Sequence, residues 1–282
     1  MPLRRAKLFK SLPVAGLLTA CIAGQVFASP EQDRAAFIAL YSAKFPDLPL
    51  ENYVDGALMF SRDAKAQFDS IMEFAPFQGD IDRGRGLWEK PFRNGKSFAG
   101  CFARGGSNIA GNYPYYDSGS DKVVTFETDI NRCLRENGET EYKFNDKATM
   151  GTLSAYARTL SDGMRVNVRV EGAGALAKYE QGKKLYFSRI GQYNFACASC
   201  HMANAGKILR TEILSPTIGH TTHWPVFRGG DNLNTLHMRY RRCMEQMRAY
   251  PFPAGSEELN NLEYFQSYLS NGLPMRASVY RK

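Results

Sequence analysis

The amino-acid sequence predicts a mainly α-helical protein that consists of two similar domains in tandem. Two observations lead to this expectation: apolar residues recur at helical spacing, and one pattern of residues occurs twice along the chain. The chain has 282 residues, of which 44% are hydrophobic and 23% are charged. This composition excludes a disordered, collagen-like or coiled-coil protein, and the length suits two domains.

Residues 1–28 are predicted to be a cleavable secretory signal peptide. Four basic residues precede an uncharged apolar run from Leu12 to Phe27, and Ala28 is the small residue expected before a cleavage site. The run is shorter than the roughly 20 residues that span a bilayer, so we expect no stable membrane insertion. A lipoprotein signal processed at Cys21 is the less favoured alternative, because the residues before Cys21 resemble a lipobox.

The net charge of +8 overstates how basic the mature protein is, because it counts 36 basic against 28 acidic residues of the whole chain. Removing the four basic residues of the signal peptide leaves 32 against 28, a net charge of +4. The basic excess is therefore no argument for a nucleic-acid partner. Export indicates a periplasmic protein, whose five remaining cysteines lie in an oxidising compartment.

The sequence Cys197-Ala198-Ser199-Cys200-His201 has the spacing of a c-type haem attachment motif. Two thiols three positions apart reach the two vinyl groups of one porphyrin, and the imidazole that follows reaches the iron. A thioredoxin-like pair belongs to a βαβ unit, and a zinc site needs a second pair of ligands. Neither context is present, so the motif predicts one covalently bound haem c.

Two helices are expected to flank this motif. One covers residues 181–189, and the other follows Ser256, a favourable N-cap residue, and stops at Asn271-Gly272. The second helix carries four apolar residues at helical spacing, and we expect it to pack against the first. A haem motif between two such helices is typical of a small cytochrome-c-like domain.

The same pattern occurs earlier in the chain in a degenerate form. The segment Phe98-Ala99-Gly100-Cys101-Phe102 stands 99 positions before the haem motif, with phenylalanine in place of the first cysteine and of the histidine. Two further matches follow in the same order, Arg132-Cys133 with Arg242-Cys243, and Leu153, Tyr156 and Leu160 with Leu262, Phe265 and Leu269.

Three matches in one order predict a duplication. We therefore expect a haem-less cytochrome-c-like domain at residues 29–172 and a haem-binding cytochrome c domain at residues 173–282. The boundary is placed at the small residues Gly172-Ala173-Gly174.

Cys101 and Cys133 match the positions of Cys200 and Cys243 in the second domain. Because no porphyrin lies between them, we expect Cys101 and Cys133 to form a disulfide that stabilises the first domain by about 2–4 kcal/mol. Two unpaired buried thiols are the alternative, which an oxidising compartment disfavours.

Two thioether bonds and one disulfide account for four of the five mature cysteines and leave Cys243. It lies 42 residues after His201, where many haem domains place the second axial ligand. On a helix Arg239 shares a face with Cys243, and nearby cations favour the thiolate form of a cysteine. Spacing alone does not choose between Cys243 and its rivals as sixth ligand, which are Met238, Met244, Met247, His220, His223 and His237.

The degenerate repeat, the single surviving haem motif and the later pair Arg239 and Cys243 together resemble SoxA, the catalytic subunit of the SoxAX cytochrome of thiosulfate oxidation. The likeness covers essentially the whole mature chain, and the phenylalanines at positions 98 and 102 make it similar to the one-haem kind. The resemblance implies that Cys197 and Cys200 carry the haem and that His201 is the proximal ligand.

It further implies that Cys243 is the distal ligand and the catalytic cysteine, which in the family is found as a persulfide, and that Arg239 helps to bind the anionic substrate. The implied enzyme is a cysteine S-thiosulfotransferase. It works as a heterodimer with the monohaem SoxX and joins thiosulfate oxidatively to a cysteine of the carrier SoxYZ, while electrons pass through haem to an acceptor cytochrome c.

Two alternatives to this function remain. One is an exported electron-transfer cytochrome whose sixth ligand is methionine or histidine and which performs no sulfur chemistry. The other is a haem-bearing scaffold or sensor that has a partner but no turnover.

Overall fold

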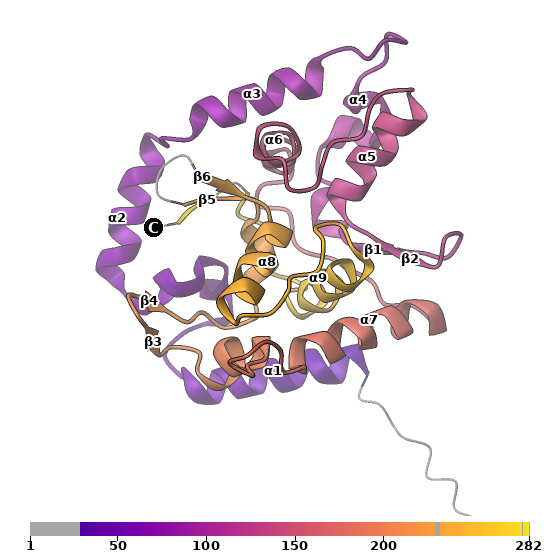
Figure 1. Ribbon diagram of the computed structural model, residues 1–282. Helices are drawn as coiled ribbons and strands as arrows, with labels where there is room; N and C mark the ends of the chain where they lie inside the picture. The colour runs from indigo at the N-terminus through magenta and orange to yellow at the C-terminus, as the bar shows by residue number, and fades with distance from the viewer. Residues whose placement is uncertain (1–28, 229–231, 278, 282) are drawn as a thin grey trace, which may run out of the picture.

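The computed structural model describes residues 29–228, 232–277 and 279–281, so the predicted signal peptide and Cys21 lie outside the described residues. The described part is mainly helical, which confirms the predicted class (Figure 1). Its α-helices are α1 (Pro30–Lys44), α2 (Arg62–Glu73), α3 (Gln78–Glu89), α4 (Phe98–Cys101), α5 (Phe126–Glu136), α6 (Thr152–Thr159), α7 (Gly172–Phe187), α8 (Leu236–Gln246) and α9 (Glu257–Leu269). None of these helices has both the length and the apolar character needed to cross a membrane.

The strands are short and form three small sheets. Two are antiparallel pairs, β1 (Tyr115–Asp117) with β2 (Lys122–Val124), and β3 (Ile208–Leu209) with β4 (Glu212–Ile213). In the third sheet β5 (Val226–Arg228) lies between antiparallel β6 (Asn232–Asn234) and parallel β7 (Tyr280–Arg281).

The two helices expected around the haem motif are present. Helix α9 begins after Ser256, whose hydroxyl accepts a hydrogen bond from the Leu259 amide, and ends at Leu269 as predicted. Helix α7 begins earlier than expected, at Gly172, so the small residues 172–174 form its first turn rather than a linker. Gly174 is needed there because a Cβ atom would collide with the Tyr116 hydroxyl.

Helices α7 and α9 pack against each other, as predicted, and their backbones approach very closely. A Cβ atom at Gly182 on α7 would collide with the backbone of Asn261 on α9. The pair α3 and α6 repeats this arrangement, since a Cβ atom at Gly84 would collide with the Thr152 carbonyl. In both pairs glycine permits the approach.

Two sets of elements follow one another in the same order. The amino-terminal set consists of α3, α4, the pair β1–β2, α5 and α6. The carboxy-terminal set consists of α7, the turn at residues 197–201, the pair β5–β6, α8 and α9. Figure 1 shows α3 to α6 gathered on one side of the molecule, opposite α1 and α7, with α8 and α9 between them.

The core does not divide at residue 172, where the sequence places the domain boundary. Helix α1 and the 3₁₀ segment Leu50–Phe60 belong to the predicted first domain, but their aromatic residues pack on the carboxy-terminal set. Phe37 and Tyr41 of α1 share one buried cluster with Tyr186 of α7 and Phe265 of α9. The amino-terminal helix therefore covers apolar surface that α7 and α9 would otherwise expose to water.

The amino-terminal set has an aromatic core of its own. The indole ring of Trp88 lies 5.5 Å from the ring of Phe98 and 5.2 Å from that of Phe102, and all three residues are buried. The phenylalanines at the two degenerate motif positions thus fill the interior of this set with hydrophobic side chains.

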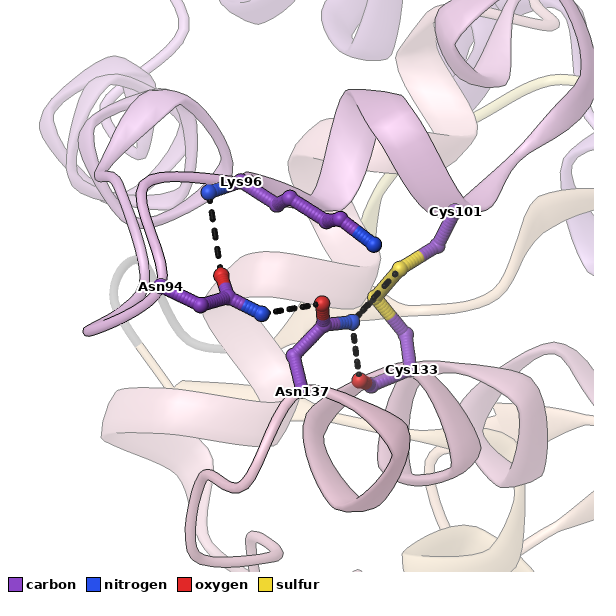
Figure 2. Close-up of a disulfide and its surroundings, with 5 residues drawn as sticks. All are labelled: Asn94, Lys96, Cys101, Cys133 and Asn137. Atoms are coloured by element: carbon purple, nitrogen blue, oxygen red, sulfur yellow. Dashed lines mark hydrogen bonds between the residues drawn. A yellow bond between two sulfur atoms is a disulfide. The ribbon is translucent and has the colours of Figure 1, made fainter.

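The structure contains the predicted disulfide between Cys101, at the end of α4, and Cys133, on α5. Their Cα atoms are 5.8 Å apart. Figure 2 shows Asn137 beside the bond, with its amide nitrogen 2.8 Å from the Cys133 carbonyl oxygen and 3.4 Å from the Cys101 sulfur. Asn94 in turn donates a hydrogen bond to the Asn137 side-chain oxygen.

Replacing both Cys101 and Cys133 by serine is expected to lower the free energy of unfolding by about 2–4 kcal/mol, because the unfolded chain loses a covalent constraint. Denaturant titration followed by circular dichroism measures this change. Reductant should lower the midpoint of the wild type and leave that of the double variant unchanged. Equal midpoints of the oxidised wild type and the variant would contradict a stabilising role.

Gly182→Ala is expected to destabilise the protein by about 1–3 kcal/mol, because the added methyl group forces α7 away from α9. Gly86→Ala on α3 is the matched control, since its added Cβ atom meets no atom within 4 Å. The control should stabilise the protein by about 0.4–1 kcal/mol through the unfolded state. Thermal unfolding of both variants tests the pair, and equal shifts would refute the close crossing.

Candidate functional site

The motif Cys197–His201 lies in a tight turn between α7 and β3. Within this turn the Ser199 hydroxyl accepts a hydrogen bond from the Ala196 amide at 3.0 Å, and the Asn204 side chain donates to the Ser199 carbonyl at 2.7 Å. Cys197 and Cys200 are half-buried and form no disulfide. Both thiols are therefore available for attachment.

The His201 imidazole is prepared to ligate a metal. Its Nδ1 lies 2.9 Å from the Ser215 carbonyl oxygen, which can only accept, so Nδ1 carries the proton and Nε2 keeps its lone pair. Burial lowers the pKa of His201 to about 4, and the positive charge of Arg239 contributes to this decrease. The ring is consequently neutral at neutral pH, which is the form that binds iron.

Helix α1 fastens the backbone of this turn. The Tyr41 hydroxyl donates a hydrogen bond to the His201 carbonyl at 2.6 Å and accepts one from the Thr217 amide at 3.1 Å, while the Lys44 ammonium group donates to the Ala203 carbonyl. The sequence analysis did not identify Tyr41 or Lys44. They lie about 160 positions from the motif, and no local pattern connects them to it.

Helix α8 supplies the other side of the site. It starts after Thr235, whose side chain accepts a hydrogen bond from the Met238 amide, and it carries Arg239 and Cys243 one turn apart. Burial raises the pKa of Cys197 to about 12, and the charge of a Cys243 thiolate adds to this increase. The same two causes raise the pKa of Cys200. The fold thus brings the three sulfur atoms within electrostatic range of one another.

Three of the rival ligands have other contacts. His237 accepts a hydrogen bond at Nδ1 from the Gly255 amide, and its Nε2 lies 3.1 Å from a carboxylate oxygen of Glu263. The Nε2 atom of His220 lies within hydrogen-bond distance of the Ser215 hydroxyl, at 2.8 Å. The His220 ring packs edge-on against that of His201, with the ring centroids 4.4 Å apart. Met244 is buried in the hydrophobic core.

Of the four arginines around Cys243, three have partners. Arg241 donates a hydrogen bond to the Phe252 carbonyl at 2.8 Å, and Arg242 lies 3.6 Å from Glu245. The guanidinium group of Arg248 lies over the ring of Tyr193. Among the described residues the Arg239 guanidinium group has no hydrogen-bond or ion-pair partner, and the residue is half-buried. A half-buried guanidinium group without a counter-ion is suited to bind a small anion.

These residues fit a covalently bound haem. Two unbonded thiols with the correct spacing lie beside a neutral imidazole whose lone pair is not used in a hydrogen bond to the protein backbone. A third sulfur, that of Cys243, comes from a different helix. The amino-terminal set has no such donors, because phenylalanines stand at the matching positions 98 and 102 and its cysteines are joined in a disulfide.

The family model of the SoxA/TsdA cytochrome c domain matches residues 83–166, which cover most of the amino-terminal set. The chain is 42% identical over 253 residues to the L-cysteine S-thiosulfotransferase subunit SoxA of Chlorobaculum tepidum, covering 89% of this chain and 88% of the relative. It is also 42% identical over 258 residues to the subunit of the same name from Allochromatium vinosum, covering 90% and 91% of the two chains.

A solved structure, the crystal structure of SoxXA from P. pantotrophus, has a similar fold. The TM-score is 0.67 and the sequence identity 30%, over 73% of this chain and 79% of that one. Because the two curated relatives match over most of both chains and the solved structure has a similar fold, the chain belongs to the SoxA family.

Proposed function

We propose that this chain is the SoxA subunit of an L-cysteine S-thiosulfotransferase, and that it couples thiosulfate oxidatively to a cysteine of a SoxYZ carrier. The observation that carries the proposal is the arrangement on α8. The charge of a Cys243 thiolate contributes to raising the pKa of both haem-motif cysteines, and the guanidinium group of Arg239, one turn away on α8, has no hydrogen-bond or ion-pair partner among the described residues. The names and the identity of the relatives support the same function.

The reaction needs a site for an anion and a sulfur that can carry another sulfur. Thiosulfate is a small dianion, and Arg239 can hold it by charge-assisted hydrogen bonds. Cys243 supplies a soft nucleophilic sulfur, as a thiolate or as the persulfide that the family resemblance implies. In the net reaction the carrier thiol and thiosulfate form one sulfur–sulfur bond and release one proton and two electrons.

The haem, when bound, accepts electrons one at a time. The residues that would hold it are Cys197 and Cys200 through thioether bonds, His201 through its Nε2 nitrogen, and Cys243 through its sulfur. Tyr41 and Ser215 fix the backbone and the tautomer of His201. One haem per chain is the count that the residues support, because the amino-terminal set has no attachment motif.

The proposed location of the protein is the periplasm, and residues 1–28 are the proposed cleavable signal peptide that directs its export. A SoxX-type monohaem cytochrome is the proposed partner subunit, in agreement with the similar fold of the SoxXA structure. An acceptor cytochrome c takes the electrons. The amino-terminal set is proposed to be the haem-less half of a duplicated cytochrome c, since its elements follow the order of the carboxy-terminal set.

Cys243→Ala is expected to reduce thiosulfate coupling to below about 1% of wild type, because the reacting sulfur is removed. Haem attachment should remain, since its two thioether bonds come from Cys197 and Cys200. Pyridine haemochrome spectra count the haem, and electron paramagnetic resonance of the oxidised wild type should show a low-spin thiolate signal. A histidine–methionine signal in the wild type would favour the plain electron-transfer cytochrome instead.

Arg239→Ala is expected to lower kcat/KM for thiosulfate by about 10–100-fold, because one charge-assisted hydrogen bond to the dianion is lost. Arg242→Ala is the matched control, since Arg242 is exposed and paired with Glu245 and should leave the kinetics nearly unchanged. Steady-state assays with the SoxX-type partner and the carrier measure both variants. Equal effects of the two substitutions would remove Arg239 from the substrate site.

A further inference from the structure

Cys243 occupies the same place on its helix as Cys133 does on the corresponding helix of the amino-terminal set. Helices α5 and α8 both have 11 residues and both begin after a threonine N-cap, and each carries its cysteine at the eighth position. They also end alike. The Glu139 amide donates to the Leu134 carbonyl at 2.9 Å, and the Ala249 amide donates to the Met244 carbonyl at 3.0 Å.

Cys200 in turn matches Cys101. Each is the fourth residue of a helical segment, which ends at Cys101 in one set and continues past Cys200 in the other, and in both the preceding amide donates a 3.0 Å hydrogen bond three residues back, from Gly100 to Ser97 and from Ser199 to Ala196. The backbone that leads up to the second cysteine is therefore held by the same hydrogen bond in both sets.

In both sets the segment before the turn is fastened to the end of the cysteine-bearing helix. Asn94 donates to Asn137 at 2.8 Å in the amino-terminal set. In the carboxy-terminal set the amides of Gln192 and Tyr193 each lie 3.4 Å from a carbonyl oxygen just after α8, and Gly191 has no room for a Cβ atom against Met247. In each set the segment before the turn is thus connected to the carboxy-terminal end of the cysteine-bearing helix.

The outcome in the amino-terminal set is a disulfide whose Cα atoms are 5.8 Å apart, within the range that a disulfide spans (Figure 2). In the carboxy-terminal set Cys200 and Cys243 stand at the matching positions of the turn and of the helix, and both thiols are unbonded.

We propose that, before haem is attached, Cys200 and Cys243 form a disulfide that competes with haem for Cys200. The inference rests on the proposed roles of these cysteines in the loaded protein. Cys243 attacks the sulfur–sulfur bond of a small or protein disulfide and releases one thiol. Cys200 then displaces the second thiol from the mixed disulfide. Two protein thiols are oxidised, and one oxidant disulfide is reduced to two thiols.

The consequence is that the haem-free chain loses two functional groups at once. The Cys200–Cys243 disulfide removes one attachment thiol and also masks the sulfur proposed to carry out coupling. A chain without haem is therefore inert toward thiosulfate, and a thiol reductant must open this bond before haem attaches.

The first test maps disulfides in the full chain exported by cells that lack haem-attachment enzymes. After alkylation of free thiols, a non-reducing digest should yield a linked Cys200–Cys243 peptide as the main form of Cys243. The Cys101–Cys133 peptide serves as an internal marker of correct folding. The Cys197→Ser variant should keep the Cys200–Cys243 link, and Cys200→Ser should leave Cys243 alkylated. A dominant Cys197–Cys200 link, or free Cys200 and Cys243 beside an intact marker, would overturn the proposal.

A second measurement needs no haem-free preparation. Under limiting haem supply, reduced glutathione in the medium should raise covalent haem per chain in the wild type and leave Cys243→Ser, already at the higher level, unchanged. An equal response of both proteins would refute competition by Cys243. Neither readout depends on thiosulfate turnover, so loss of coupling activity in a separate assay bears on the proposed function alone.

Discussion

The close crossing of α7 and α9 is the constraint on which the rest of the site depends. A glycine at position 182 lets the two backbones touch, and the buried aromatic residues around it fill the space on both sides of the crossing. Residues 188–196 connect the end of α7 to the haem-motif turn, and α8 packs beside α9 through Tyr240, which donates a hydrogen bond to Gln266. The packing of α7 against α9 therefore sets the relative position of the motif and of Cys243.

Buried charges connect the two sets of helices. Arg158 of α6 lies 3.4 Å from Glu127 of α5 and 3.9 Å from Glu263 of α9, and Glu263 also contacts His237 of α8. Burial opposes the ionisation of Glu127, but the charge of Arg158 and a hydrogen bond from Ser154 hold its pKa below the usual value. Removing one member would leave an uncompensated buried charge, so the cluster keeps the sets in one arrangement.

The interiors of the two sets contain different kinds of side chain. The carboxy-terminal set has three unbonded thiols, the His201 imidazole and the Arg239 guanidinium group near its centre. Among the described residues this guanidinium group has no hydrogen-bond or ion-pair partner. Polar and reactive groups therefore lie in its interior. The amino-terminal set replaces the corresponding motif residues by phenylalanines that contact Trp88 and joins its cysteines covalently. Hydrophobic burial and a covalent cross-link together stabilise the interior of this set.

The sequence by itself predicted helix α9 with its Ser256 cap and the Cys101–Cys133 disulfide, and the structure confirms both. These predictions depend on residue types and on their spacing, both of which the sequence gives directly. The early start of α7, the packing of α1 on the carboxy-terminal set and the contacts of Tyr41 with His201 were decided by tertiary structure. So was the choice among four arginines, since only long-range contacts with Phe252 or Tyr193 show which guanidinium groups are already engaged. The residues that make these contacts do not recur at a regular spacing in the chain. The sequence therefore does not indicate their pairing, which is visible only in the folded state.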